Sequence, residues 1–163
     1  MIHHLQPDDI ETFKSIRLEA LRQDPDAFAT YAEDWERLSD DEWRSRLKST
    51  QVFVAIEGTE PVGIMGLMRQ APSKAAHRAS IIMVYVRPDQ RGTGVADRLL
   101  ASLTDFASGS GIRQLELMVS AENPAAIGFY RKAGFEQVGL IPNGLLHEGR
   151  AFDQIVMARS IIT

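Results

Sequence analysis

Hydrophobic side chains in the first third of the chain recur at the spacing of a helix. From Ile10 to Leu21 they fall roughly every three positions, and the Asp24-Pro25 step ends the pattern. Residues 31–48 repeat this period around two tryptophans, which predicts that part of that range forms a second, more polar helix. A short strand over 2–5 is expected before both helices.

From residue 52 the pattern changes to strands alternating with helices. The run ASIIMVYV at 79–86 is continuously apolar and β-branched, which is typical of a central strand buried on both faces. Asn123-Pro124 favours a helix start and Gly134 suits its end. The expected elements are strands at 52–58, 62–69, 79–86, 112–119, 136–141 and 152–158, helices at 95–107 and 124–133, and a polar loop at 142–150. This order, β-α-α-β-β-β-α-β-α-β-β, predicts a single mixed α/β domain over residues 1–163.

The composition and charge of the chain limit the classes of partner that are expected. The chain has 163 residues, a net charge of −4 and no basic run, so nucleic acid is not an expected partner. No apolar run approaches the ~18 residues of a membrane span, and no secretory leader is evident at the start. A cytoplasmic protein without a membrane partner is therefore expected.

Cysteine and histidine usage limits the chemistry. The absence of cysteine excludes disulfides, thiolate metal sites and any covalent cysteine mechanism. His3 and His4 are adjacent, and in a strand such neighbours point to opposite faces, so they do not make a metal site. No metal is expected.

A glycine pair stands between the strand at 79–86 and the following helix. Glycines there either make a turn or let helix amides approach an anion. No Walker loop is present, and the third glycine of a dinucleotide fingerprint is replaced by Asp97. The stretch Arg91-Gly92-Thr93-Gly94-Val95-Ala96 instead fits the pattern (Gln/Arg)-x-x-Gly-x-(Gly/Ala).

A second block lies one helix and one strand downstream. Residues 123–135, NPAAIGFYRKAGF, fit the pattern Asn-x-x-Ala-x-x-x-Tyr-x-x-x-Gly-Phe. With both blocks in this order, the chain resembles the GNAT superfamily of N-acetyltransferases over nearly its whole length. The resemblance implies a mixed, mostly antiparallel sheet of about six or seven strands with about four flanking helices. It also implies that the sheet is splayed between 79–86 and 112–119.

The same resemblance implies acetyl-CoA as the cosubstrate. Its pyrophosphate is expected on the backbone amides of the glycine loop, and its pantetheine arm on the end of the preceding strand. The residues so assigned are Arg91, Gly92, Thr93, Gly94, Val95 and Ala96 in the loop and Val84, Tyr85 and Val86 in the strand. Val84 is also expected to polarise the acetyl carbonyl through its amide. Asn123 has two compatible roles, as a helix N-cap and as a contact to the cofactor arm.

Tyr130 is the expected general acid. In the family motif this tyrosine protonates the departing thiolate, while the alternative is a core tyrosine with a satisfied hydroxyl. The general base is less defined, because the strand at 79–86 contains no carboxylate. Glu116 in the next strand and His77 in a loop are the two candidates, with a chain of waters as a third route.

The acceptor side is expected near the first two helices and the loop before the last strand. Phe28, Tyr31 and Glu33 are the predicted acceptor-binding residues, with Asp34 and Trp35 beside them. The loop contributes His147, Glu148 and Arg150. A solvated helix start explains the acidic residues equally well.

The expected function is direct transfer of an acetyl group to a primary amine of a small, amino-acid-like acceptor. Three alternatives stay open: a protein lysine or N-terminal acetyltransferase, a CoA-binding sensor without turnover, and transfer of a longer acyl group. The apolar last strand, FDQIVMARSII, also leaves a homodimer open.

Overall fold

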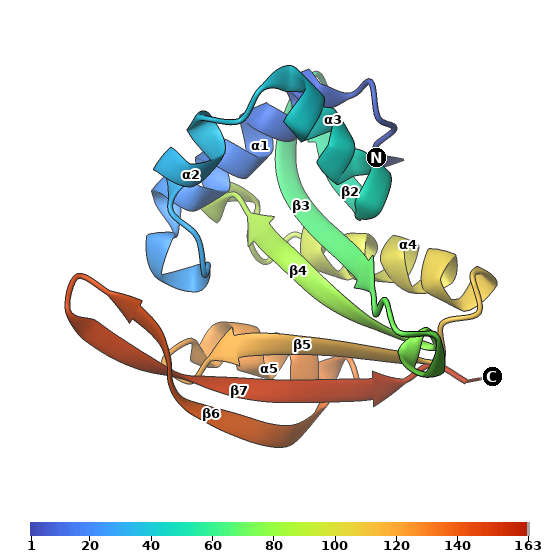
Figure 1. Cartoon of the computed structure of the whole chain (residues 1–163), viewed down its shortest axis with the longest axis vertical. Helices are drawn as coiled ribbons and strands as arrows, with labels where there is room; N and C mark the ends of the chain where they lie inside the picture. The colour runs from blue at the N-terminus through green and yellow to red at the C-terminus, as the bar shows by residue number, and fades with distance from the viewer. Residues whose placement is uncertain (163) are drawn as a thin grey trace.

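Seven strands form one sheet in the computed structural model, which describes residues 1–162 (Figure 1). The strands are β1 (Ile2–His4), β2 (Gln51–Glu57), β3 (Glu60–Arg69), β4 (Arg78–Val86), β5 (Gln114–Ser120), β6 (Glu136–His147) and β7 (Arg150–Ser160). The α-helices are α1 (Ile10–Gln23), α2 (Ala32–Glu36), α3 (Asp40–Ser49), α4 (Val95–Gly109) and α5 (Pro124–Lys132). The strand order is β1-β2-β3-β4-β5-β7-β6, and β4 with β5 is the parallel pair among antiparallel ones. The predicted α/β class and mostly antiparallel sheet are confirmed.

One helix more than expected forms within 31–48. Ser39 interrupts the helical run, because its hydroxyl accepts from the Glu42 amide at 3.2 Å while the Glu42 carboxylate accepts from the Ser39 amide at 3.3 Å. This reciprocal capping box starts α3 as a separate helix. The segment therefore folds as α2 and α3, which lets Trp35 and Trp43 pack against Phe13 of α1.

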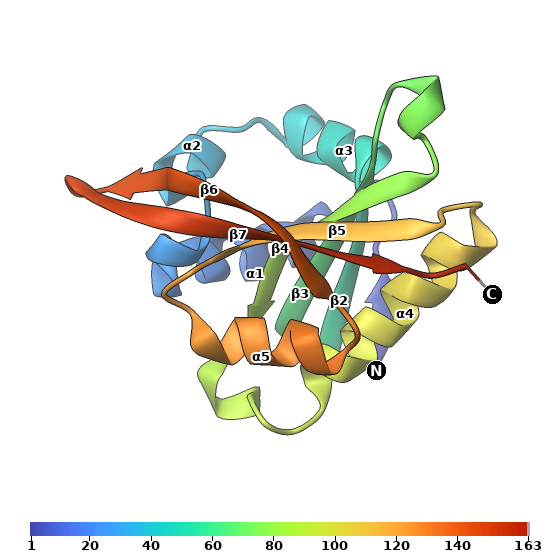
Figure 2. The ribbon, with the colours of Figure 1, turned by 90° about the horizontal axis from the view of Figure 1, so that it is seen from below.

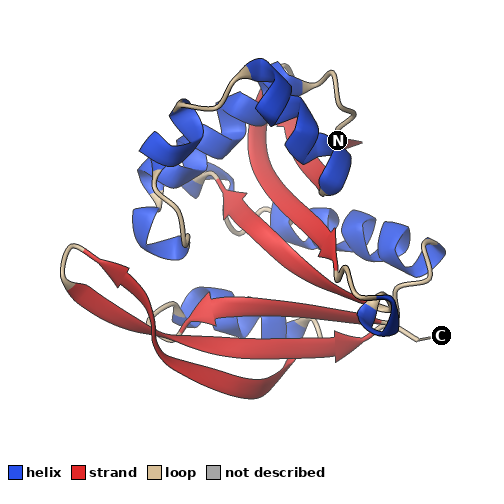
Figure 3. Ribbon diagram, in the orientation of Figure 1, coloured by secondary structure: helices blue, strands red, loops and turns tan. Residues whose placement is uncertain are grey.

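The helices cover both faces of the sheet (Figures 2 and 3). Residues of α1, α2 and α3 form one hydrophobic core with β2, β3 and the end of β4. Residues of α4 and α5 form the second core with β3, β4, β5 and β7 on the opposite face. The candidate site lies between these two layers, where β4 and β5 diverge from each other.

The splay expected between β4 and β5 is confirmed. The two strands pair only over Arg78–Ser80 and Gln114–Glu116, and they diverge beyond that point toward the carboxyl end of β4 (Figure 1). A bulge accompanies the divergence: Met83 has a φ of +57°, and Ile82 and Met83 pack on the same core. The far half of β4 therefore has an edge that no strand covers.

The last hairpin is longer than predicted. The expected loop at 142–150 is wrong, because β6 runs on to His147 and β7 starts at Arg150, where these two residues pair. Glu148 and Gly149 make the turn with φ of +53° and +75°, the backbone that a two-residue hairpin favours. A bulge between Ile141 and Leu145 interrupts the alternation of polar and apolar residues, so the sequence pattern does not indicate a strand there.

Edge strand β6 exposes apolar side chains, among them Val138 and Leu140. The homodimer stays a prediction. Across residues 1–162, no helix has the length and apolarity that a membrane crossing needs. No three His, Asp or Glu side chains of this region gather closely enough to hold a metal ion.

Candidate active site

The glycine loop presents bare backbone amides at the start of α4. Gly94 is the N-cap residue and, with φ of +87°, lies in the left-handed region; Gly92 shares it at +78°. None of the amides from Gly92 to Ala96 makes a well-formed hydrogen bond within the described chain. A Cβ at Gly92 would meet nothing within 4 Å, so the loop faces open space. These are the features of an anion cradle.

The Arg91 side chain holds this loop in place. Its Nε donates to the Val86 carbonyl at 2.9 Å, and its Nη2 donates to Asp24 Oδ2 at 2.9 Å. Thr93 reinforces the turn by donating its hydroxyl to the Gln90 carbonyl. Side chains thus fix the loop while its amides stay available.

The far half of β4 carries Val84, Tyr85 and Val86 past the last pairing with β5. The Tyr85 hydroxyl donates to Glu19 Oε2 at 3.0 Å, and Arg87 Nη2 donates to Glu19 Oε1 at 2.7 Å. Burial and the Glu19 contact raise the pKa of Tyr85 to about 12, while Arg87 lowers the pKa of Glu19. Val84 and Val86 pack on the opposite core. The strand end is therefore held from both faces, which leaves its backbone edge toward the opening.

Both sequence motifs line one cavity of about 430 Å³ at the wide end of the splay. Arg91 comes from the glycine loop, and Asn123 from the start of α5. Asn123 caps the helix, because its Oδ1 accepts from the Ala126 amide at 3.1 Å. The two predicted cofactor segments are thus brought together.

Tyr130 lies on α5 with its ring packed against Phe129 and Phe135 at centroid distances of 5.3 and 5.7 Å. Its side chain is buried, and this burial raises the pKa of the Tyr130 phenol above its ordinary value. The hydroxyl has no hydrogen-bond partner among the described residues, and it is not among the solvent-sealed unpartnered atoms. The phenol therefore stays protonated at neutral pH with its hydroxyl unengaged.

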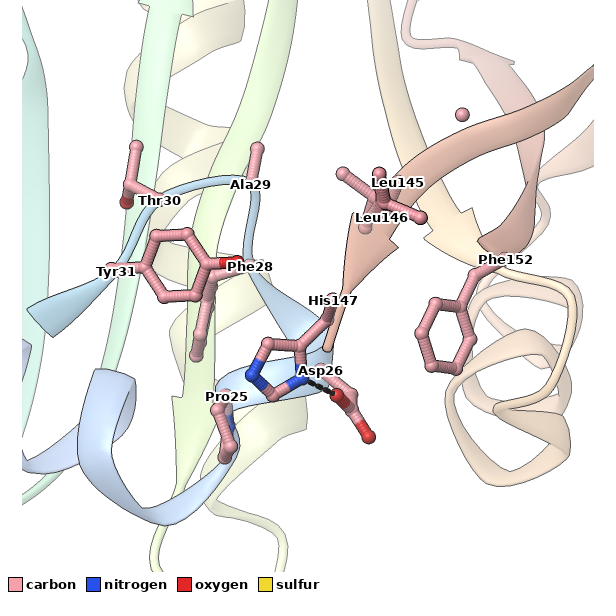
Figure 4. A pocket seen from close by; sticks show the side chains of 11 residues that line it. Pro25, Asp26, Phe28, Ala29, Thr30, Tyr31, Leu145, Leu146, His147 and Phe152 are labelled. Atoms are coloured by element: carbon pink, nitrogen blue, oxygen red, sulfur yellow. Dashed lines mark hydrogen bonds and ion pairs between the residues drawn. The ribbon is translucent and has the colours of Figure 1, made fainter. Parts of the chain in front are cut away.

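A second cavity, of about 270 Å³, lies between the segment after α1 and the β6–β7 hairpin (Figure 4). Of the three predicted acceptor-binding residues, Phe28 and Tyr31 line this cavity and Glu33 does not. Both cavities include Asp26 and Phe152 in their walls, so they adjoin.

His147 is a wall residue of this second cavity, and its imidazole faces Phe28 and Tyr31 (Figure 4). Its Nδ1 is hydrogen-bonded to Asp26 Oδ1 across the cavity. An imidazole held by a carboxylate is the arrangement of a general base. The sequence analysis placed His147 near the acceptor and missed Asp26, which lies 121 positions earlier in the sequence.

The two predicted bases lie elsewhere. Glu116 sits at the closed end of the splay, where its Oε2 is 2.9 Å from Arg78 Nε and accepts from Gln114 Nε2 at 2.7 Å. His77 precedes β4, so the strand places it roughly 25 Å from the loop that follows Val86. Neither residue lines the two cavities.

A splayed sheet with an amide cradle at its wide end defines the N-acetyltransferase type of α/β fold. The model of the acetyltransferase (GNAT) family matches residues 16–135, and the chain belongs to this family. The predicted resemblance is confirmed.

Similar proteins carry acetyltransferase names. An uncharacterized N-acetyltransferase of Methanocaldococcus jannaschii is 29% identical over 88% of this chain and 64% of its own length. An L-methionine sulfoximine/L-methionine sulfone acetyltransferase of Pseudomonas aeruginosa is 38% identical over 45% of this chain and 43% of its own. The chain thus spans less than two thirds of these relatives. A GNAT-family acetyltransferase structure from Streptococcus pneumoniae superposes with a TM-score of 0.86 at 22% identity, covering 99% of both chains.

Proposed function

We propose that this protein transfers an acetyl group from acetyl-CoA directly to the primary amine of a small-molecule acceptor. The observation that carries the proposal is the junction of the two adjoining cavities. One is lined by both cofactor motifs, and the other by the Asp26–His147 pair. Relatives with acetyltransferase names support the same reaction, as does the Salmonella typhimurium yncA structure, solved with its cofactor acetyl-CoA (TM-score 0.79, 19% identity).

The segments that carry Arg91 and Asn123, the two predicted cofactor residues in the wall of the first cavity, fit the cosubstrate. The amides of Gly92 to Ala96 are unpaired and bind the pyrophosphate, and the open edge of β4 binds the pantetheine arm through its backbone. Acetyl-CoA supplies an activated thioester. The Val84 amide stabilises the negative charge that develops on the carbonyl oxygen.

We assign the proton transfers to two side chains, His147 in the wall of the second cavity and Tyr130 on α5. His147, held by Asp26, takes a proton from the acceptor ammonium, so that the neutral nitrogen attacks the carbonyl carbon and the C–S bond breaks. His147 passes that first proton to solvent and then accepts the second proton of the nitrogen, while Tyr130 protonates the departing sulfur and is reprotonated from water, so that one proton is released per transfer. This assignment replaces Glu116 and His77 as the base, because both lie outside the cavities.

A cavity of about 270 Å³ favours a small acceptor over a folded protein. The alternative substrate, a protein N-terminus, has support from N-alpha-acetyltransferase RimI of Mycobacterium tuberculosis, which is 47% identical over 57 residues. That match covers 35% of this chain and 34% of the relative.

The test is an acceptor screen with acetyl-CoA, read as thiol release and as the mass of the acetylated product. Small amines and amino acids are compared with peptides that have a free N-terminus, and propionyl-CoA is compared with acetyl-CoA. We expect release with small amines only. Release with peptides alone supports protein acetylation, while CoA binding without any release supports a sensor and refutes transfer.

A further inference from the structure

Arg17 is a buried cation without a partner. It lies on α1 with 4% of its surface exposed, and its Nε and Nη1 are sealed from solvent without a hydrogen bond in the described part of the chain. An unpaired buried charge is costly in a folded protein, and a guanidinium offers its N–H donors in one plane. A buried site of this kind is ordinarily completed by an anion.

The surroundings of Arg17 supply aromatic faces and no negative charge. Its guanidinium carbon lies 4.9 Å from the ring centre of Phe28 and 4.5 Å from that of Trp35. Arg46 stacks on Trp35 as well, at 4.4 Å. Burial and then Arg46 lower the pKa of Arg17 to about 10. Stacking satisfies the faces of the guanidinium and leaves Nε and Nη1, which solvent does not reach, without a hydrogen-bond partner.

The same aromatic residues connect Arg17 to the second cavity. Phe28 contacts Arg17 and also lines that cavity. Trp35 is tied to the cavity wall, because its Nε1 donates to Thr30 Oγ1 at 3.1 Å. The unsatisfied donors therefore lie directly behind the wall that faces His147.

We propose that Arg17 binds a carboxylate of the acceptor, so that the substrate class is an amino acid rather than a simple amine. The inference rests on the proposed function and narrows it. Arg17 does not itself line the cavity, so the carboxylate reaches its unpartnered N–H donors when the Phe28 ring, which contacts Arg17 and lines the cavity, moves aside, while Trp35 holds the guanidinium in orientation. The amine of the same molecule is then directed toward His147 in the cavity.

The test compares L-amino acids with the α-amides of the same amino acids, which keep the amine and the size and lose the charge. With acetyl-CoA, we expect kcat/KM for the acids to exceed that for the amides by ~100-fold, as a buried charged pair implies. In Arg17→Met the preference should fall to within about 3-fold. Arg46→Met removes the other stacked guanidinium on Trp35, and is expected to keep the preference.

A second readout does not depend on transfer. The rise in Tm caused by the same acids in the presence of CoA should occur in the wild type and be lost in Arg17→Met and Arg17→Lys. Equal kcat/KM for acids and amides in the wild type overturns the role of Arg17 and leaves acetyl transfer standing. Arg17-dependent Tm shifts without any transfer support the carboxylate site and overturn the proposed function. No transfer and no Tm shift overturn both.

Discussion

Arg91 Nη2 lies 2.9 Å from Asp24 Oδ2, which joins the glycine loop to the segment that follows α1. Both side chains are partly exposed, so the pair contributes only ~0–1 kcal/mol to stability. Its effect is to orient the loop. We expect Asp24→Asn to keep the Tm and to weaken acetyl-CoA binding by about 5-fold in calorimetry. The Arg22–Glu36 pair, at 2.8 Å, is a matched exposed control, and Glu36→Gln should leave that affinity unchanged.

Gly94 is the position where backbone freedom and ligand access coincide. Its φ of +87° disfavours any other residue, and a side chain there would stand among the free amides. Gly94→Val should weaken acetyl-CoA binding by at least ~100-fold, the loss of two charge-assisted hydrogen bonds. Gly111 has a φ of +81° just beyond the opposite end of α4, where an added Cβ would meet nothing within 4 Å, so Gly111→Val shares the strain away from the loop. An equal loss of affinity in both variants would show that strain alone is responsible.

The variant Tyr130→Phe tests whether the hydroxyl acts in the acetyl-transfer step rather than in the binding of acetyl-CoA. The hydroxyl has no partner in the described chain, so its removal should cost little stability. As the proton donor to the sulfur, it is expected to contribute ~100-fold to kcat, with the Kd of acetyl-CoA unchanged. Stopped-flow measurement of the acetyl-transfer step checks this directly. A wild-type rate would return Tyr130 to the core tyrosine that its packing also allows.

Local patterns in the sequence were enough to predict the elements that carry the proposed donor half of the site. The run at 79–86 and the Asn123–Phe135 block carry their signals within a few residues, so strand, loop and helix cap were predictable. The bulge at Met83 was not predictable from the sequence, because a φ of +57° at a methionine follows from sheet packing and has no local signal.

The acceptor half depends on contacts between distant segments. Asp26 and His147 are 121 positions apart, and only the β6–β7 hairpin brings them together. Arg17 falls on the buried stripe of α1, so the helical period indicates its position, but the aromatic rings of Phe28 and Trp35 that cover it come from later segments. The contacts that bring these residues together therefore depend on segments far apart in the sequence, which no local pattern reports.

The Glu19–Arg87–Tyr85 cluster predicts a pH dependence of stability. Arg87 lowers the pKa of Glu19, so this contribution is present above the unfolded value of 4.5 and is lost as pH falls through the folded pKa. Tyr85, with its pKa raised to about 12, contributes below pH 10 and loses that contribution as pH rises through 12. Glu19→Gln should cost about 1–2 kcal/mol at pH 7, and the difference from wild type should shrink below pH 4 in thermal unfolding. A constant difference from pH 3 to pH 9 would contradict the linkage.

The final prediction concerns the base. If His147 removes the acceptor proton, then His147→Gln should lower kcat by ~100-fold at pH 7. The deficit should narrow as the pH approaches the amine pKa, ~8 for an α-amino group or ~10.4 for an alkylamine, because the acceptor then arrives neutral. Asp26→Asn is expected to give a smaller loss, since the ring stays but its orientation is no longer held by the carboxylate.

Glu148 supplies the control for this test. Its Oε1 lies 3.9 Å from His147 Nε2 and its side chain is largely exposed, so Glu148→Gln removes a nearby charge without touching Nδ1. We expect wild-type pH–rate profiles in that variant. Because a structural role of His147 would lower kcat equally at every pH, recovery at high pH distinguishes a base from a wall residue. A pH-independent loss in His147→Gln would leave proton removal to solvent, and the Asp26–His147 pair would then serve only to close the cavity.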